Sequence, residues 1–187
     1  TSFELEGSNI IHMRKSTINE DVILEFIYDA TSSLIGINTI EGNYFYVRDI
    51  TGNIIGLIDK EGEFVIKYAY DAWGNILNKE VFDDCIASRH NPFVYKGYFL
   101  DEETDFYYLK TRYYDPKIRR FISIDDPHFI DSENFSGLNL YCYCLNNPIM
   151  LSDAGANSSV SMRFSRPTKH TANVPTTFSF AINPVTA

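Results

Sequence analysis

The sequence predicts an all-β protein built mainly from a row of β-hairpins. A nine-residue pattern occurs three times, the segments between its copies alternate large apolar and polar residues, and 15% of the residues are aromatic. Aromatic and β-branched side chains fit a half-buried pleated surface better than a helix. A repeat of about 20 residues is typical of arrays in which each unit is one supersecondary element.

The repeats superpose without gaps and carry an aspartate at their second position. They are YDATSSLIG (28–36), RDITGNIIG (48–56) and YDAWGNILN (70–78), with Asp29, Asp49 and Asp71 at intervals of 20 and 22 residues. We expect a strand, a turn and a return strand in each. Asp bonds the backbone two residues on, and Gly-Asn supplies a positive φ. The repeat aspartates are therefore expected to be structural, and DKEG (59–62) predicts the turn at the opposite end of a strand pair.

The pattern changes near residue 81. The segment NKEVFDDCIASRHNP (78–92) is polar and irregular, which indicates a linker or excursion. Two strands are then expected, at 93–100 and 106–114, around the turn DEETD, followed by a short strand in RFISI. LNLYCYCLNNP predicts a strand or a short helical segment. The last 31 residues, 157–187, are rich in Ser, Thr, Asn and Pro, so we expect a disordered, variable tail.

Composition excludes several classes of function. The net charge of −9 argues against nucleic acid as a direct partner, because phosphate binding needs an excess of Lys and Arg. No apolar run is long enough for a membrane span, and no secretory leader opens the sequence, so we interpret it as a fragment. Cys85, Cys142 and Cys144 do not form a CxxC motif, and the histidines are not spaced as the ligands of a metal ion usually are. We therefore expect no disulfide, metal or cofactor, and we interpret Cys142 and Cys144 as small buried residues on one face of a strand.

Several of these motifs together resemble a known family. YDAWGNI, NPFVYKGYFLDEETDFYYLKTRYYDPKIRRFIS and GLNLYCYCLNNP resemble YD repeats and the Rhs repeat-associated core domain. That core occurs in Rhs and wall-associated polymorphic toxins and in the C component of insecticidal toxin complexes. The resemblance covers residues 3–156 and is strongest over 92–153.

The resemblance implies a fold and a set of partners. Residues 1–80 would be YD-type hairpins from a spiral β-sheet shell, 81–156 the Rhs core that closes the shell, and 157–187 a variable polar tail. The implied partners are the upstream shell, the protein's own C-terminal toxin segment and an immunity protein for that toxin. The implied location is secreted or at the cell surface, with the export signal outside this segment.

The resemblance also implies self-cleavage after the core by a reaction like that of aspartic proteases. Two aspartates that share a proton can activate water and protonate the scissile group. The matching positions are Asp125 in FISID and Asp153 in NNPIMLSDAGA, with Asp126 adjacent to the first. Arg120, just before FIS, would orient a carboxylate or the scissile carbonyl.

Each of these residues also has a simpler interpretation. Asp125 and Asp126 precede Pro127, and Asp before Pro is a common start of a turn. Arg112, Arg119 and Arg120 would more simply be solvated or packed on tyrosine rings, which alone would explain arginines among tyrosines.

The sequence departs from the family pattern at four positions. The expected DPxG reads DAGA, with Ala154 and Ala156, and Asp105 and Arg119 stand where the family usually has Gly. The tail carries no recognisable toxin signature. An alternative therefore stays open: a purely structural encapsulation or display module, or a surface-adhesion module that uses exposed aromatic residues, with no enzymatic activity.

Overall fold

The computed structural model describes residues 1–16, 18, 20–124, 139–153 and 161–162. Its main element is an eight-stranded antiparallel sheet in which every strand pairs with the next one along the chain. The strands are β1 (Ser2–Glu6), β2 (Asn9–Ser16), β3 (Asp21–Tyr28), β4 (Leu34–Asn38), β5 (Asn43–Arg48), β6 (Ile54–Ile58), β7 (Phe64–Tyr70) and β8 (Ile76–Val81). The all-β prediction and the predicted row of hairpins are confirmed.

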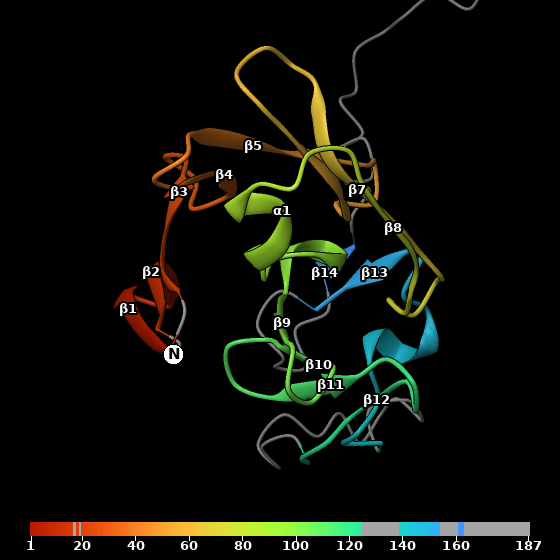
Figure 1. Ribbon diagram of the computed structural model, residues 1–187. Coiled ribbons are helices and arrows are strands. Elements are labelled where there is room, and N and C mark those ends of the chain that lie inside the picture. Colours follow the sequence, from red (N-terminus) through yellow and green to blue (C-terminus); the bar gives the residue numbers. More distant parts are fainter. Residues whose placement is uncertain (17, 19, 125–138, 154–160, 163–187) are drawn as a thin grey trace, which may run out of the picture.

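The sheet follows an arc, and the segments that come after it lie inside that arc (Figure 1). Side chains alternate between the two faces, as the period of a strand requires. In β3, for example, Val22, Leu24 and Phe26 are buried, whereas the residues between them are exposed. The buried face forms one hydrophobic cluster with the later segments.

One five-residue turn closes four of the hairpins. In each, the aspartate Oδ1 accepts the backbone N–H groups two and four residues on at 2.8–2.9 Å, and the aspartate N–H donates to the carbonyl four residues on. The aspartates are Asp29, Asp49, Asp59 and Asp71. The fourth residue of each turn has a φ between 61° and 96°. The structural role predicted for the repeat aspartates is confirmed.

The residue before each repeat aspartate ties the end of its strand to the strand before. The bonds are Tyr28 Oη to Ile10 O at 2.9 Å, Arg48 Nη2 to Leu34 O at 3.1 Å, and Tyr70 Oη to Ile54 O at 2.6 Å. A guanidinium therefore replaces the tyrosine hydroxyl in the second repeat, which explains why RD can stand where YD is usual.

Residues 78–92 are not the irregular linker that the sequence predicts. They contain a short helix, α1 (Ile86–His90), with Ile86, Ala87 and Ser88 buried. The Ile86 N–H donates to the Glu41 carboxylate in the β4–β5 turn, so the sheet holds the start of the helix. Five residues are too few to show a helical period, and tertiary burial orders them instead. Within the described part of the chain, no helix is long and apolar enough to span a membrane.

The following segment forms a small four-stranded sheet with the order β12-β11-β10-β9. Its strands are β9 (Phe99–Asp101), β10 (Phe106–Tyr108), β11 (Tyr113–Asp115) and β12 (Arg120–Phe121). The two longer strands predicted at 93–100 and 106–114 are each interrupted. The 3-10 turn η1 (Tyr95–Gly97) breaks the first, and Lys110, with φ 68°, breaks the second.

The last described segment contains the 3-10 turn η4 (Cys144–Asn146) and the hairpin of β13 (Leu151–Ser152) with β14 (Ser161–Met162). Cys144 has φ 48° in η4, so the prediction that Cys142 and Cys144 share a strand face is wrong. Cys144 is nevertheless buried and Cys142 half-buried, both as free thiols. The tail predicted at 157–187 lies outside the described residues except at β14.

Three tyrosine hydroxyls attach the later segments to the last repeat. They donate to three successive backbone carbonyls of one turn: Tyr95 to Ala72 at 2.8 Å, Tyr114 to Trp73 at 2.9 Å and Tyr107 to Gly74 at 2.7 Å. Gly74 has φ 96°, and a Cβ built on it would lie 2.6 Å from the Tyr95 ring. The turn therefore needs glycine both for its conformation and for the close approach of the ring.

We expect Gly74→Ala to lower the free energy of unfolding more than Gly62→Ala does. Both glycines have a positive φ, 96° and 88°, where alanine costs roughly 1–2 kcal/mol. Only the alanine at 74 would also overlap a ring, which adds about 1–3 kcal/mol. Urea unfolding of the two variants measures the difference. Equal losses at both positions would show that Tyr95 does not constrain the turn.

We expect Arg119→Gly to stabilise the protein. Arg119 has φ 63°, and its N–H closes a turn on Asp115 O at 2.8 Å. Relief of the left-handed strain is worth roughly 1–2 kcal/mol, reduced by loss of the Arg119 contact with the Trp73 ring. Lys117→Gly, in the same turn without a positive φ, is the control and should destabilise. A lower melting temperature for both variants would contradict the prediction.

Candidate functional site

Asp153 is buried at the end of β13. It is 2% exposed, and its backbone carbonyl accepts the Tyr98 hydroxyl at 3.0 Å. The Tyr143 hydroxyl donates to that of Tyr98 at 3.2 Å, so one phenol binds the backbone beside the carboxylate and a second phenol supports the first. A carboxylate in such surroundings is a candidate functional group, because buried charges otherwise destabilise a fold.

The arginine beside this carboxylate is Arg112. Its Nη2 lies 4.0 Å from Asp153 Oδ2, and both side chains are almost fully buried. Its Nη1 donates to the Leu140 carbonyl at 3.0 Å, and its guanidinium covers the Phe121 ring at 3.7 Å. The ring packing predicted for Arg112 is confirmed, with Phe121 as the ring. The same side chain also faces Asp153, which the sequence analysis did not assign to it.

The other candidate arginine, Arg120, lies on the small sheet. Arg120 is exposed on β12 and lies opposite Asp115 in the ladder. Its neighbour Phe121 is buried, so strand alternation turns Arg120 outward. On the neighbouring strand Tyr113 is exposed and Tyr114 is buried, and Arg112, two residues before Tyr114, is buried as well. This alternation could have identified Arg112 from the sequence. Asp125 and Asp126 lie outside the described residues.

A second buried cation, Lys96, contacts the backbone shortly before Asp153. Its Nζ donates to the carbonyls of Pro148 at 2.5 Å and Leu151 at 2.6 Å. The ammonium also lies 5.3 Å from the Tyr95 ring centre and 5.5 Å from that of Tyr143. The site therefore combines one buried carboxylate, two buried cations and a wall of tyrosine rings.

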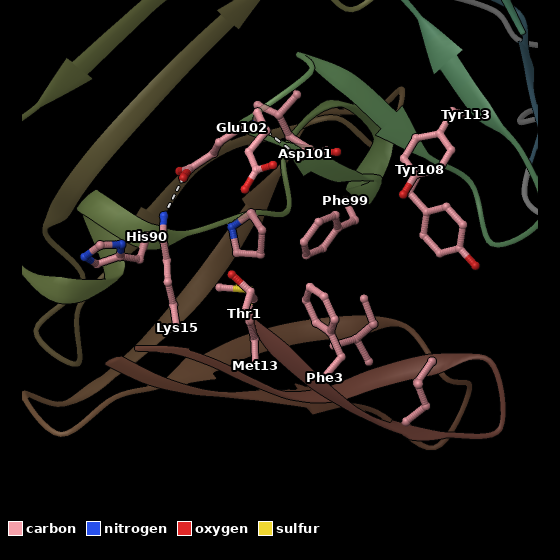
Figure 2. A pocket seen from close by; sticks show the side chains of 15 residues that line it. Thr1, Phe3, Met13, Lys15, His90, Phe99, Asp101, Glu102, Tyr108 and Tyr113 are labelled. Atoms are coloured by element: carbon pink, nitrogen blue, oxygen red, sulfur yellow. Dashed lines mark hydrogen bonds and ion pairs between the residues drawn. The ribbon is translucent and has the colours of Figure 1, made fainter. Parts of the chain in front are cut away.

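An open groove of about 490 Å³ separates the first hairpin from the β9–β10 hairpin (Figure 2). Phe3 and Phe99 face each other across it with ring centres 5.5 Å apart, and Lys15 reaches across to Glu102 at 2.7 Å. Asp101 lies beside Glu102 on the same wall (Figure 2). The groove has an apolar floor and an acidic rim, and can receive apolar side chains of another polypeptide segment.

The buried tyrosines act as neutral hydrogen-bond donors. Burial raises the pKa of Tyr98, Tyr107, Tyr114 and Tyr143 above the ordinary value for tyrosine. Their hydroxyls therefore keep the protons that bind the carbonyls of the last repeat and of Asp153. The tyrosine rings also pack closely against one another, with the Tyr114 and Tyr143 ring centres 4.1 Å apart.

Comparison with known proteins identifies a family whose model matches most of this chain. A family model described as Teneurin YD-shell matches residues 12–149. The tRNA nuclease WapA of Bacillus subtilis (strain 168) is 33% identical over 150 residues, which are 80% of this chain and 6% of WapA. The tRNA3(Ser)-specific nuclease WapA of Bacillus spizizenii is 32% identical over the same share of each chain. The chain thus spans only a small part of these relatives.

Solved structures share the fold. The crystal structure of TcdB2-TccC3-Cdc42 superposes with a TM-score of 0.61 over 73% of this chain and 7% of that one, at 23% identity. The Tc holotoxin pore of Photorhabdus luminescens gives a TM-score of 0.61 over 82% of this chain and 7% of that one, at 19% identity. These likenesses concern the arrangement of strands alone.

We expect the free energy of unfolding to fall as the pH rises above about 10, where unfolded tyrosines ionise. Burial raises the pKa of Tyr28 and Tyr68 to about 12, and of the core tyrosines further. The unfolded chain then binds fewer protons than the native one, so stability decreases with pH in this window. Urea unfolding across a pH series measures the slope, and Tyr107→Phe should make it shallower. A stability that stays constant above pH 10 would contradict the prediction.

Proposed function

Because this chain belongs to the Teneurin YD-shell family, we propose that it closes a β-sheet shell that encloses a C-terminal toxin polypeptide. The observation that carries the proposal is the attachment of the later segments inside the arc of the sheet through Tyr95, Tyr107 and Tyr114. Polypeptide that returns to the inner face of its own sheet is suited to cap the end of a spiral. We assign residues 1–80 to the repeats, 81–156 to the closing core and 157–187 to a variable tail.

The groove supports contact with enclosed polypeptide. It lies between the first hairpin and β9–β10 and exposes apolar side chains such as Phe3, which is 46% exposed. The WapA relatives are named as tRNA nucleases, whereas the net charge of −9 makes this segment a poor surface for a polyanion. We therefore place any toxin activity on the enclosed polypeptide and not on the shell segment.

The proposed partners follow from this role. They are the upstream part of the shell, the protein's own C-terminal toxin segment and an immunity protein for that toxin. The proposed location is secreted or at the cell surface, as the resemblance to secreted toxins implies.

We further propose that the core cuts the chain just after itself, beyond residue 156. In the proposed reaction Asp153 and Asp125 share a proton. The ionised partner takes a proton from water as the water oxygen bonds to the scissile carbonyl carbon. The protonated partner donates to the departing nitrogen, the C–N bond breaks, and a carboxylate and an amine result.

Arg112, and not Arg120, is the arginine that we assign to this reaction. The distance of 4.0 Å between Arg112 Nη2 and Asp153 Oδ2 supports this assignment, as does the packing of the guanidinium on the Phe121 ring. A fixed cation favours the ionised form of a nearby carboxylate. Its role would be to keep one of the two aspartates ionised.

The alternative is a purely structural module for encapsulation, display or surface adhesion. The DAGA sequence at 153–156, in place of the family's DPxG, favours it. So do the exposed aromatic side chains, among them Phe3 at 46% and Tyr113 at 42%, both of which line the groove. In this alternative Asp153 and Arg112 would only stabilise the core.

We expect Asp125→Asn and Asp153→Asn each to slow release of the C-terminal tail by about 10⁴-fold, since each removes one member of the pair. Asp126→Asn is the matched control and should leave release unchanged. Arg112→Lys should slow release by about 10²-fold or more, and Arg120→Gln should not. Mass spectrometry of the purified chains over time gives the rates and the bond that is cut.

The same measurement decides between the two functions. An unmodified chain that stays intact would leave the structural module as the correct function. Cleavage that survives both aspartate substitutions would exclude the aspartate pair as its cause.

A further inference from the structure

Lys96 occupies a position that disfavours lysine for two reasons, its burial and its backbone conformation. It is 8% exposed, and a buried ammonium is unfavourable unless its donors are satisfied. Its φ is 54°, in the left-handed region where glycine is preferred and where other residues are strained. A glycine would suit the backbone and an apolar residue would suit the burial, so the ammonium itself must have a use at this place.

The ammonium is bonded to the two ends of one short turn. Its Nζ donates to Pro148 O at 2.5 Å and to Leu151 O at 2.6 Å. The turn is also closed by the Leu151 N–H, which donates to Asn147 O at 3.1 Å. Lys96 thus fixes the backbone immediately before β13, from a segment more than 50 residues earlier.

Tyr98, two positions after Lys96, binds the same stretch of backbone. Tyr98 donates its hydroxyl to the carbonyl of Asp153 itself at 3.0 Å. Lys96 and Tyr98 together therefore hold three carbonyls along the stretch from Pro148 to Asp153. Leu151 and Ser152 of that strand pair with β14, and the proposed scissile region follows Asp153 in the sequence.

We propose that Lys96 is a positioning residue for the Asp153 site, which fixes the strand that carries the aspartate and leads into the scissile region. This inference rests on the proposed self-cleavage. The ammonium acts through backbone carbonyls and does not touch the reacting atoms. It places the Asp153 carboxylate beside Arg112 before the reaction begins, which is the form of catalysis that preorganised groups provide.

The same turn connects the site to the last YD repeat. Tyr95, next to Lys96, donates to Ala72 O in the repeat turn at 2.8 Å. The segment 95–98 therefore contacts the last repeat on one side and the Asp153 strand on the other. Cleavage would require the core to be docked on the sheet, so the chain would be cut only after the shell has closed.

The first test compares rates of tail release in the chain of residues 1–187. Lys96→Met keeps the length of the side chain without its donors, and Lys96→Arg keeps charged donors. Gly62→Ala is the matched control, because it destabilises a turn in which nothing lies within 4 Å of the new methyl. We expect Lys96→Met to slow release by about 100-fold, Lys96→Arg to restore most of the rate, and Gly62→Ala to release the tail at the unmodified rate.

The second test does not depend on cleavage. Hydrogen exchange at the Leu151 amide is measured in the uncut Asp153→Asn chain with and without Lys96→Met. We expect exchange to become about tenfold faster when the ammonium is absent. Unchanged exchange, or equal slowing by Lys96→Met and Gly62→Ala, would overturn the proposal. An unmodified chain that is never cut would refute the proposed cleavage and with it the catalytic purpose of Lys96, whereas the exchange result would still decide whether Lys96 fixes the strand.

Discussion

The fold depends on three tyrosine hydroxyls that bind three successive carbonyls of a single turn. The carbonyls of Ala72, Trp73 and Gly74 accept the three phenols at 2.7–2.9 Å. Consecutive acceptors and a fixed order of donors leave one register in which the core can dock on the sheet. Because the core tyrosines have pKa values raised by burial, they remain donors throughout the physiological pH range. This attachment therefore fixes the tyrosine-bearing segments of the core against the last repeat.

This attachment explains why the turn of the last repeat tolerates fewer residue types than the turn of the first repeat does. The aspartate and the backbone satisfy each turn locally, so the first repeat can place Ser32 at the residue with positive φ. The last turn meets further constraints, because the Tyr95 ring covers Gly74 and the Asn75 side chain donates to Pro116 O at 3.2 Å. Local hydrogen bonding thus defines the repeat, and tertiary contact selects which copy keeps the strictest form.

The sequence predicted what local chemistry determines. The repeat aspartates and the hairpins could be inferred from turn chemistry. The positions of Asp105 and Arg119, both observed at φ 63°, were marked only by the resemblance, because the family usually has Gly there. Helix α1 could not, since its order comes from burial under the sheet and not from a periodic pattern. The interruption at Lys96 of the strand predicted at 93–100 could not be predicted either. Alternation of apolar and polar side chains does not reveal a residue with a left-handed backbone inside a strand-like segment.

The candidate site illustrates why the core needs the rest of the sheet. Arg112, Lys96 and Asp153 are all buried, and the desolvation of such groups can exceed the attraction between them. Their arrangement is therefore unfavourable unless the surrounding structure fixes it. The tyrosine cluster provides this support, because its rings exclude water and its hydroxyls bind backbone that would otherwise be unsatisfied. The cluster is itself held by the last repeat, so the buried charges of the core are stabilised only when the core is docked on the sheet.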